Sequence, residues 1–121
     1  MNECDFCSEG VSDDDPRALV YPAVDFASTE LQFKSAGGWL ACPTCVAFIR
    51  QYDLGERDAR NNLARRSLEK LRRKYDIRGA ADSKEVTAIL LIEITQLHDA
   101  FWEYRRGEPV PYTRKALEER R

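Results

Sequence analysis

The second half of the chain contains two long stretches in which apolar residues recur every three or four positions. In the first stretch the recurring residues are Ala64, Leu68, Leu71 and Tyr75. In the second stretch they are Leu90, Ile94, Leu97, Phe101 and Tyr104. This period matches one face of an α-helix, so we expect two amphipathic helices that pack together as an antiparallel hairpin.

The second of these helices carries more apolar surface than a single partner helix covers. Ile89, Leu91 and Ile92 widen its apolar face beyond one stripe. We therefore expect this helix either to form the centre of the core or to contribute to a dimer interface.

Capping signals precede both helices. Asp53 with Glu56 three residues later fits a capping box, although Gly55 would equally well close a preceding helix. Asp82 with Glu85 gives the same signal before the second helix. Together these signals place the helical hairpin at about residues 56–107.

Residues 108–121 are expected to form a charged C-terminal tail. Gly107 and Pro109 close the second helix, and Pro111 adds a second break. Thr113 could cap a short charged helix in this tail.

The first half of the chain shows the shorter alternation that is typical of β-strands. Residues 19–26 mix β-branched and aromatic side chains around a proline, which suits an edge strand or an extended segment. Residues 30–34 alternate between polar and apolar side chains, and an apolar run covers residues 39–41. Gly37 and Gly38 lie between these runs and predict a β-hairpin with its turn at the two glycines.

All cysteines of the chain lie in two C-x-x-C pairs, which are formed by Cys4, Cys7, Cys42 and Cys45. Each pair folds into a tight knuckle that offers two sulfurs to one metal ion. Four thiolates are the ligand set of a closed structural zinc site, so we expect one structural Zn²⁺ per chain, bound by all four cysteines. Such a site leaves no open position for water or substrate, which argues against catalysis at the metal.

Disulfide bonds, redox chemistry and another metal are the alternative uses of these cysteines. Residues 1–10 are polar and lack the apolar segment of a secretory leader, so we expect a cytoplasmic protein, in which stable disulfides are disfavoured. A redox C-x-x-C is disfavoured because neither pair follows an evident buried strand of a βα unit.

The order of these elements predicts the fold class. Pro43 follows Cys42 at the favoured first position of a helix, and Cys45 would lie in the first turn, where the helix dipole favours a thiolate. Knuckle, strands, hairpin, second knuckle and helix are the layout of a treble-clef zinc finger, which we expect over about residues 1–55. The fold class is then α+β, mainly α, with the helical hairpin packed on the finger.

Two motifs carry a resemblance to a known family. Cys4-x-Phe6-Cys7, followed by Trp39-Leu40-Ala41-Cys42-x-x-Cys45, resembles the N-terminal zinc-binding domain of the unfoldase ClpX. That family implies a non-catalytic treble clef that dimerises and binds adaptors and substrates. The resemblance covers about residues 4–52, and no ATPase module follows it. The chain also resembles small, uncharacterised bacterial and phage proteins with a C-D-F-C start; that resemblance supports the same four ligands and gives no information on activity.

The net charge of −2 conceals an uneven distribution. Residues 1–55 carry nine acidic and three basic side chains, whereas residues 56–80 carry four acidic and nine basic ones. An acidic finger is therefore joined to a basic helix. No apolar run approaches the ~20 residues that a membrane-spanning helix needs.

The basic helix is the candidate binding surface. Its cationic residues are Arg57, Arg60, Arg65, Arg66, Lys70, Arg72, Arg73, Lys74 and Arg78. They could contact the phosphates of a nucleic acid, dock on an acidic protein, or form a solvated face paired with neighbouring carboxylates. The overall acidity of the chain and the lack of a known base-reading module count against nucleic acid.

Catalytic signals are weak. His98 is the sole histidine, and the chain has no His-x-Glu element of a zinc deaminase and no phosphate-binding glycine loop. We therefore expect a non-enzymatic, zinc-stabilised binding protein that acts as an adaptor or inhibitor by protein–protein contact, either with another protein or as a homodimer. The alternative is a nucleic-acid-associated regulator that uses the basic helix.

Overall fold

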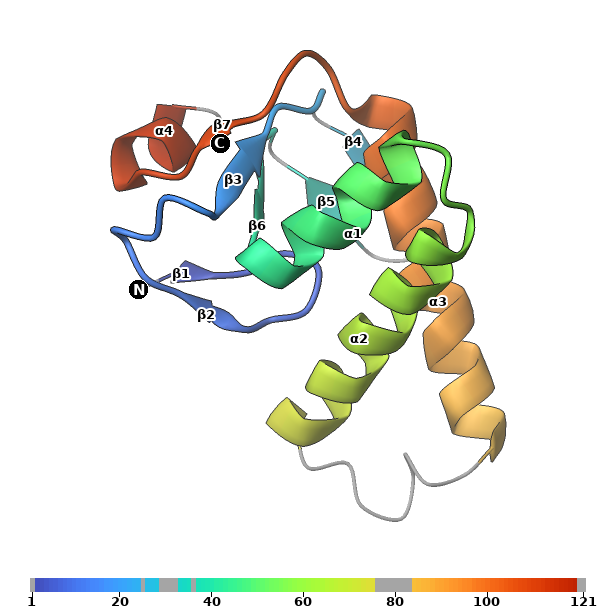
Figure 1. The fold of residues 1–121 in the computed structure, drawn as a ribbon. Coiled ribbons are helices and arrows are strands. Elements are labelled where there is room, and N and C mark those ends of the chain that lie inside the picture. Colours follow the sequence, from blue (N-terminus) through green and yellow to red (C-terminus); the bar gives the residue numbers. More distant parts are fainter. Residues whose placement is uncertain (1, 25, 29–32, 36, 76–83, 120–121) are drawn as a thin grey trace.

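A computed structural model describes the chain except for residues 1, 25, 29–32, 36, 76–83 and 120–121 (Figure 1). The described strands are β1 (Asn2–Glu3), β2 (Gly10–Val11), β3 (Leu19–Tyr21), β4 (Phe26–Ser28), β5 (Phe33–Ser35), β6 (Trp39–Ala41) and β7 (Val110–Pro111). The described helices are α1 (Pro43–Asp53), α2 (Asp58–Tyr75), α3 (Lys84–Tyr104) and α4 (Arg114–Glu119). The predicted fold class, α+β and mainly α, is confirmed. The N-terminal order of knuckle, hairpin, second knuckle and helix is that of a treble clef.

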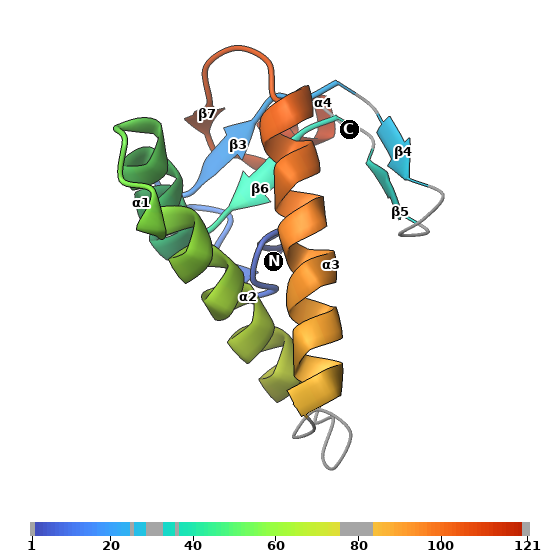
Figure 2. The same cartoon turned by 90° about the vertical axis from the view of Figure 1, so that its right-hand side faces the viewer.

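The described strands form three small antiparallel sheets that lie between and beside the helices (Figures 1 and 2). Strands β1 and β2 form the first, with Asn2 opposite Val11. The second has the order β6-β3-β7, and the third pairs β4 with β5. In Figure 2, the β4–β5 pair projects away from the rest of the molecule, on the side of α3 opposite to α2.

The predicted hairpin turn at Gly37 and Gly38 is wrong. Strand β6 pairs with β3, in the register Val20 opposite Leu40, and β5 pairs with β4 instead. Gly37 has φ +93°, a conformation that favours glycine, and it lets the chain pass from one sheet to the other. The glycine pair correctly marked a change of direction, but local sequence does not reveal which strands pair across it.

The core is built around Phe101 of α3. Its ring lies 4.9 Å from the ring of Phe6 in the first knuckle, edge to face, and 5.3 Å from the indole of Trp39 on β6. Tyr21 of β3 packs edge to face on it at 5.5 Å. Aromatic pairs at such distances add to the burial term, so this cluster joins the N-terminal knuckle to a helix that begins 80 positions after Cys4.

Helix α1 ends in a Schellman motif rather than leading into the capping box predicted at Asp53. Gly55 has φ +101°, its N–H donates to Tyr52 O at 2.9 Å, and the N–H of Glu56 donates to Gln51 O at 3.0 Å. The alternative role of Gly55, closing the preceding helix, is thereby confirmed. Asp53 instead accepts an ion pair from Arg105 at 2.8 Å, which ties the end of α1 to the end of α3.

Helices α2 and α3 run in opposite directions and pack on one another, as predicted (Figure 1). Contacts between them include the ion pair of Arg60 with Asp99 and the 3.4 Å contact of Ser67 Oγ with His98 Nε2. The capping signal at Asp82 lies outside the described residues. Helix α3 ends at Tyr104, before Gly107, in agreement with the predicted stop.

The two halves of α3 differ in burial. Its C-terminal half is the core helix that the apolar pattern predicted, with His98 and Phe101 buried. In its N-terminal half, none of the described residues 84–96 is buried, and Ile89 and Ile92 are 57% and 58% exposed. The C-terminal half of α3 therefore matches the expected core helix. The exposed N-terminal half is the segment to which the expectation of a dimer interface applies.

Residues 108–121, expected to be a charged tail, contribute to the fold from Val110 to Leu117. Strand β7 pairs with β3, and Tyr112 and Leu117 are buried in the same apolar cluster as the knuckles. The predicted cap is present, because Thr113 Oγ1 accepts a hydrogen bond from the N–H of Ala116 at 2.9 Å. The apolar residues of this segment are separated by prolines and charged residues and do not recur at a helical or strand period. The sequence therefore did not reveal this packing. Within the described ranges, no helix has the length and apolarity to cross a membrane.

We predict that Phe101→Ala destabilises the protein by about 3–5 kcal/mol, because it empties the site on which several aromatic rings converge. Unfolding in urea measures this change. The matched control on the same helix is Gln96→Ala, which removes an exposed side chain and should alter the unfolding free energy by about 0.5 kcal/mol or less. Equal losses for the two variants would contradict a core centred on Phe101.

Candidate metal centre

The first knuckle is the turn between β1 and β2. The N–H of Cys4 donates to Glu9 O at 2.8 Å, and the N–H of Ser8 donates back to Cys4 O at 2.9 Å. Ser8 has φ +65°, so the chain curls tightly enough to turn both cysteine side chains to one side. The N–H of Phe6 points at Cys4 Sγ at 3.4 Å. Such N–H groups stabilise a thiolate, because they donate to its negative charge.

The second knuckle is the junction of β6 and α1. Cys42 occupies the N-cap of α1 with extended backbone angles, Pro43 follows at the start of the helix, and Cys45 lies in its first turn. The predicted position of both cysteines is therefore confirmed. The N–H of Cys42 also points at Cys4 Sγ, at 3.3 Å, which links the two knuckles directly.

Asp5 joins the two knuckles through Leu40, a role that sequence reasoning missed. The N–H of Asp5 donates to Leu40 O at 2.8 Å, and the N–H of Leu40 donates to Asp5 Oδ2 at 2.7 Å. This reciprocal pair holds β6 against the first knuckle. The position of Asp5 between two cysteines was the available signal in the sequence. No neighbouring residue identifies its partner Leu40, which is 35 residues away.

The four cysteine sulfurs form one buried cluster. The Sγ atoms of Cys4, Cys7, Cys42 and Cys45 all lie within 4.8 Å of one another, and all four residues are buried. The Sγ atoms of Cys7 and Cys42 are 3.7 Å apart, and all four cysteines are free thiols. The structure thus brings together every residue of the predicted ligand set, in an arrangement that could hold one metal ion.

The crowded thiols shift one another's pKa values in opposite directions. Hydrogen bonding with Cys4 lowers the pKa of Cys7 to about 7 and lowers that of Cys42 as well. Contacts with Cys42 and with Cys4 raise the pKa values of Cys4 and Cys45, respectively. All four groups can ionise together once a cation lies among them, because the cation stabilises each thiolate.

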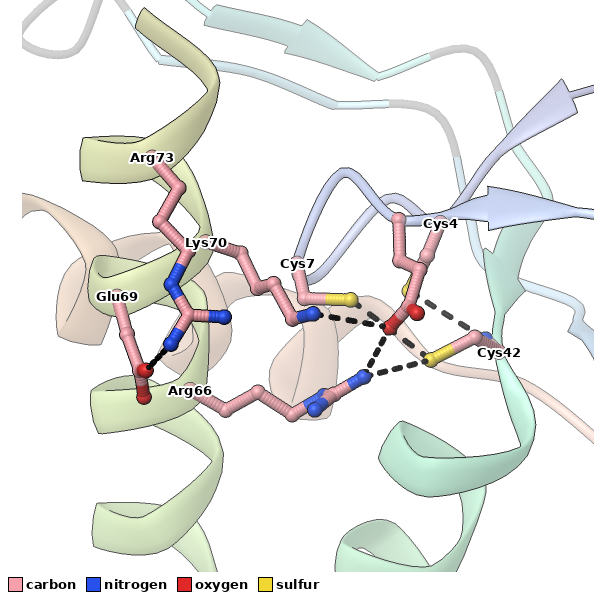
Figure 3. Close-up of polar contacts among 8 residues, drawn as sticks. Cys4, Cys7, Cys42, Arg66, Glu69, Lys70 and Arg73 are labelled. Atoms are coloured by element: carbon pink, nitrogen blue, oxygen red, sulfur yellow. Dashed lines mark hydrogen bonds and ion pairs between the residues drawn. The ribbon is translucent and has the colours of Figure 1, made fainter. Parts of the chain in front are cut away.

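Two cations of α2 lie beside this cluster (Figure 3). Arg66 places Nη2 3.8 Å from Cys42 Sγ and also pairs with the carboxylate of Glu9 in the first knuckle. Lys70, one turn further along, places Nζ 3.6 Å from the same Glu9 oxygen. The Nε atom of Arg66 is buried and has no hydrogen-bond partner among the described residues. Sequence reasoning identified both cations but assigned them to a surface, and it missed Glu9.

Several other members of the predicted basic surface are also engaged. Arg60 pairs with Asp99 of α3, and its guanidinium lies 4.6 Å from the ring centroid of Trp102. Arg73 pairs with Glu69 within α2. These side chains fasten α2 to its neighbours or to itself, which agrees in part with the solvated, paired face considered above.

The remaining members divide by exposure. Arg57 and Arg65 are exposed, and no ion pair to either is found among the described residues. Arg72 is half-buried. The Lys74 side chain and Arg78 lie outside the described residues. The described charges of the basic helix therefore do not form one surface, because they are divided between the cysteine cluster, the helix contacts and solvent.

His98 is a buried core residue. Burial lowers the pKa of His98 to about 4, so the ring is neutral at neutral pH. Its Nε2 lies 3.4 Å from Ser67 Oγ, which itself donates to Leu63 O at 3.0 Å. A cavity of about 390 Å³ adjoins the ring, between α1, α2 and α3. Its lining offers no thiol or second histidine with which this ring could form a catalytic pair.

We predict that Cys42→Ser lowers both the metal content of the purified protein and its melting temperature, because the remaining three thiols hold a metal less tightly and the knuckles separate. Elemental analysis and thermal unfolding measure the two effects. Thr44→Ala, an exposed change inside the same C-x-x-C pair, is the matched control and should leave both unchanged. Unchanged metal content and stability in Cys42→Ser would rule out metal binding by this cluster.

Comparison of the chain with models of protein families, with curated proteins and with solved structures gave no match. The resemblance to the zinc-binding domain of ClpX therefore rests on the motif residues alone. What the protein does has to be inferred from its own residues and their arrangement.

Proposed function

We propose that the metal is zinc and that the site is structural. In a regular tetrahedron of sulfurs about 2.3 Å from a zinc ion, neighbouring sulfurs lie about 3.8 Å apart. The 3.7 Å between the Sγ atoms of Cys7 and Cys42 agrees with that value, and the widest separations, up to 4.8 Å, need only a small contraction. Four soft thiolates also suit zinc better than a hard cation such as Mg²⁺ or Ca²⁺.

A site of this kind stabilises the fold and takes no part in catalysis. Protein sulfurs fill all four coordination positions, so no water is activated at the metal. The zinc would stabilise knuckles whose strands are two or three residues long and bury little apolar area by themselves. We accordingly assign the protein to the non-enzymatic class and to a reducing compartment, the cytoplasm, where thiolates persist.

The N-terminal half of α3 supports a function in protein–protein contact. Residues 86–92 form an uncharged run, Val-Thr-Ala-Ile-Leu-Leu-Ile, and none of them is buried. Exposed apolar side chains gathered on a helix are characteristic of contact surfaces, because water exposure is unfavourable for them. This is the observation that carries the proposal of an adaptor or inhibitor, and the metal centre holds the other end of the same helix in place through Phe6 and Phe101.

A nucleic-acid-associated regulator is the alternative. Arg57, just before α2, and Arg65, on α2, favour it, since both are exposed without an ion pair among the described residues. It ranks second because Arg60, Arg66 and Arg73 are committed to carboxylates of this chain. Phosphate binding would have to compete with those contacts.

We predict that a protein partner captured from host lysate by the tagged wild-type protein persists after nuclease treatment and is lost with the double variant Ile89→Glu, Ile92→Glu. Charges placed on the apolar run oppose its burial in an interface. Mass spectrometry of the captured proteins measures this. The matched control is Gln96→Glu, which adds charge to an exposed position further along α3 and should retain the partner.

Light scattering during size-exclusion chromatography completes that experiment. A mass of two chains for the wild type, and of one chain for the double variant, would identify the partner as a second copy of this protein. If the double variant captured the partner as well as the wild type does, this result would contradict the assignment of α3 as the contact surface.

The alternative makes a different prediction. Nucleic-acid binding should weaken steeply as salt rises and should be abolished by Arg65→Glu with Arg72→Glu, because each phosphate contact releases counterions. Binding to labelled DNA and RNA across a salt series measures it. If the protein acts by protein–protein contact, we expect no salt-sensitive binding of nucleic acid. The two charge reversals should then leave capture of the protein partner unchanged.

A further inference from the structure

The electrostatics of the proposed zinc site require a counter-charge. Four thiols and Zn²⁺ combine with release of four protons, so the charge of the sulfur cluster passes from zero to −2. This charge develops at four buried residues. Buried charge is unfavourable unless opposite charge or hydrogen-bond donors face it.

Arg66 faces this cluster from α2. Its Nη2 lies between Cys42 Sγ, at 3.8 Å, and the carboxylate of Glu9 (Figure 3). The side chain is 20% exposed, and its Nε is buried without a hydrogen-bond partner among the described residues. A guanidinium held in so little water is unfavourable on its own, and the negative charge of zinc-bound thiolates offsets that cost.

Lys70 adds a second positive charge one helical turn away. It reaches the centre only through Glu9, whose carboxylate it shares with Arg66. Two cations and one carboxylate next to the sulfurs leave one net positive charge, which faces the −2 of the loaded site.

We propose that Arg66, assisted by Lys70, is the counter-charge of the zinc tetrathiolate and sets both the zinc affinity and the reactivity of the zinc-bound thiolates. The inference rests on the proposed zinc site. A donor next to a metal ligand stabilises the loaded state, and it also draws electron density from the sulfur and so makes it a weaker nucleophile. Arg66 is a positioning residue in this role, because it touches a ligand and not the metal.

A purely structural role for Arg66 has to be distinguished from this electrostatic one, since the Arg66–Glu9 pair also holds α2 against the knuckle. Glu9→Gln separates the two. It removes a negative charge beside the thiolates, so the electrostatic role predicts tighter zinc and slower thiolate reaction. A structural role predicts the opposite, namely the same loosening that Arg66→Met produces.

The experiment compares Arg66→Met with Arg65→Met in zinc-loaded protein. The two arginines are adjacent, carry the same charge, and differ in that only Arg66 is placed at the centre. Zinc affinity is measured by competition with a chromophoric chelator, and thiolate reactivity by counting the acetamide groups that iodoacetamide transfers to sulfur, by intact mass. Circular dichroism verifies the fold of each variant.

We expect Arg66→Met to weaken zinc binding by about tenfold or more and to speed alkylation. Arg66→Lys, which keeps the charge, should recover part of both effects, and Arg65→Met should match the wild type. If Arg66→Met does not fold, Glu9→Gln and Arg66→Lys decide the question.

Equal effects of the Arg65 and Arg66 variants, or looser zinc in Glu9→Gln, would overturn the inference and leave the zinc site standing. A wild-type protein without zinc would instead overturn the proposed function itself. The two failures are therefore distinguishable.

Discussion

The junction of the two knuckles is the constraint on which the rest of the structure depends. The four cysteine sulfurs gather within 4.8 Å, and the reciprocal bonds of Asp5 with Leu40 align the strands that carry them. Phe6, held between Cys4 and Cys7, can pack on Phe101 only because this turn is closed. From that contact follow the position of α3 and the burial of Trp39 and Tyr21. A small sheet and a long helix thus share one core, although neither encloses enough apolar area alone.

Helix α2 connects the four-cysteine cluster to the rest of the molecule through its charges. Arg60 faces α3, whereas Arg66 and Lys70 face the first knuckle. A sequence rich in arginine is easily interpreted as a phosphate-binding surface, yet here several of the charges have partners within the chain. The positive charge of α2 lies next to the acidic first half of the chain, and Arg66 reaches the cysteine cluster there, with Nη2 3.8 Å from Cys42 Sγ. Internal compensation of this kind explains how a strongly basic helix occurs in a chain with a net charge of −2.

Some of this arrangement could be predicted from the sequence because the signals are local. The spacing of Cys4, Cys7, Cys42 and Cys45 specifies a ligand set, and the apolar period around Leu97 and Phe101 specifies a helix face. The pairing of β6 with β3 could not be predicted, since Gly37 and Gly38 show where the chain turns but not which strand it meets. Asp53 was misassigned for a similar reason. Its capping signal is real as a pattern, and a long-range partner, Arg105, outweighs it. The burial of Tyr112 and Leu117 was missed because packing there comes from tertiary contacts and not from a period.

The proposed zinc site is a closed one, with four thiolates around one zinc ion. X-ray absorption spectroscopy of the purified protein at the zinc edge tests it most directly, because it reports the type, number and distance of the ligand atoms. We expect about one zinc per chain, with four sulfur neighbours at about 2.3 Å and no nitrogen or oxygen ligand. A shell containing oxygen or nitrogen would contradict a closed structural site, and the absence of zinc would contradict the account as a whole.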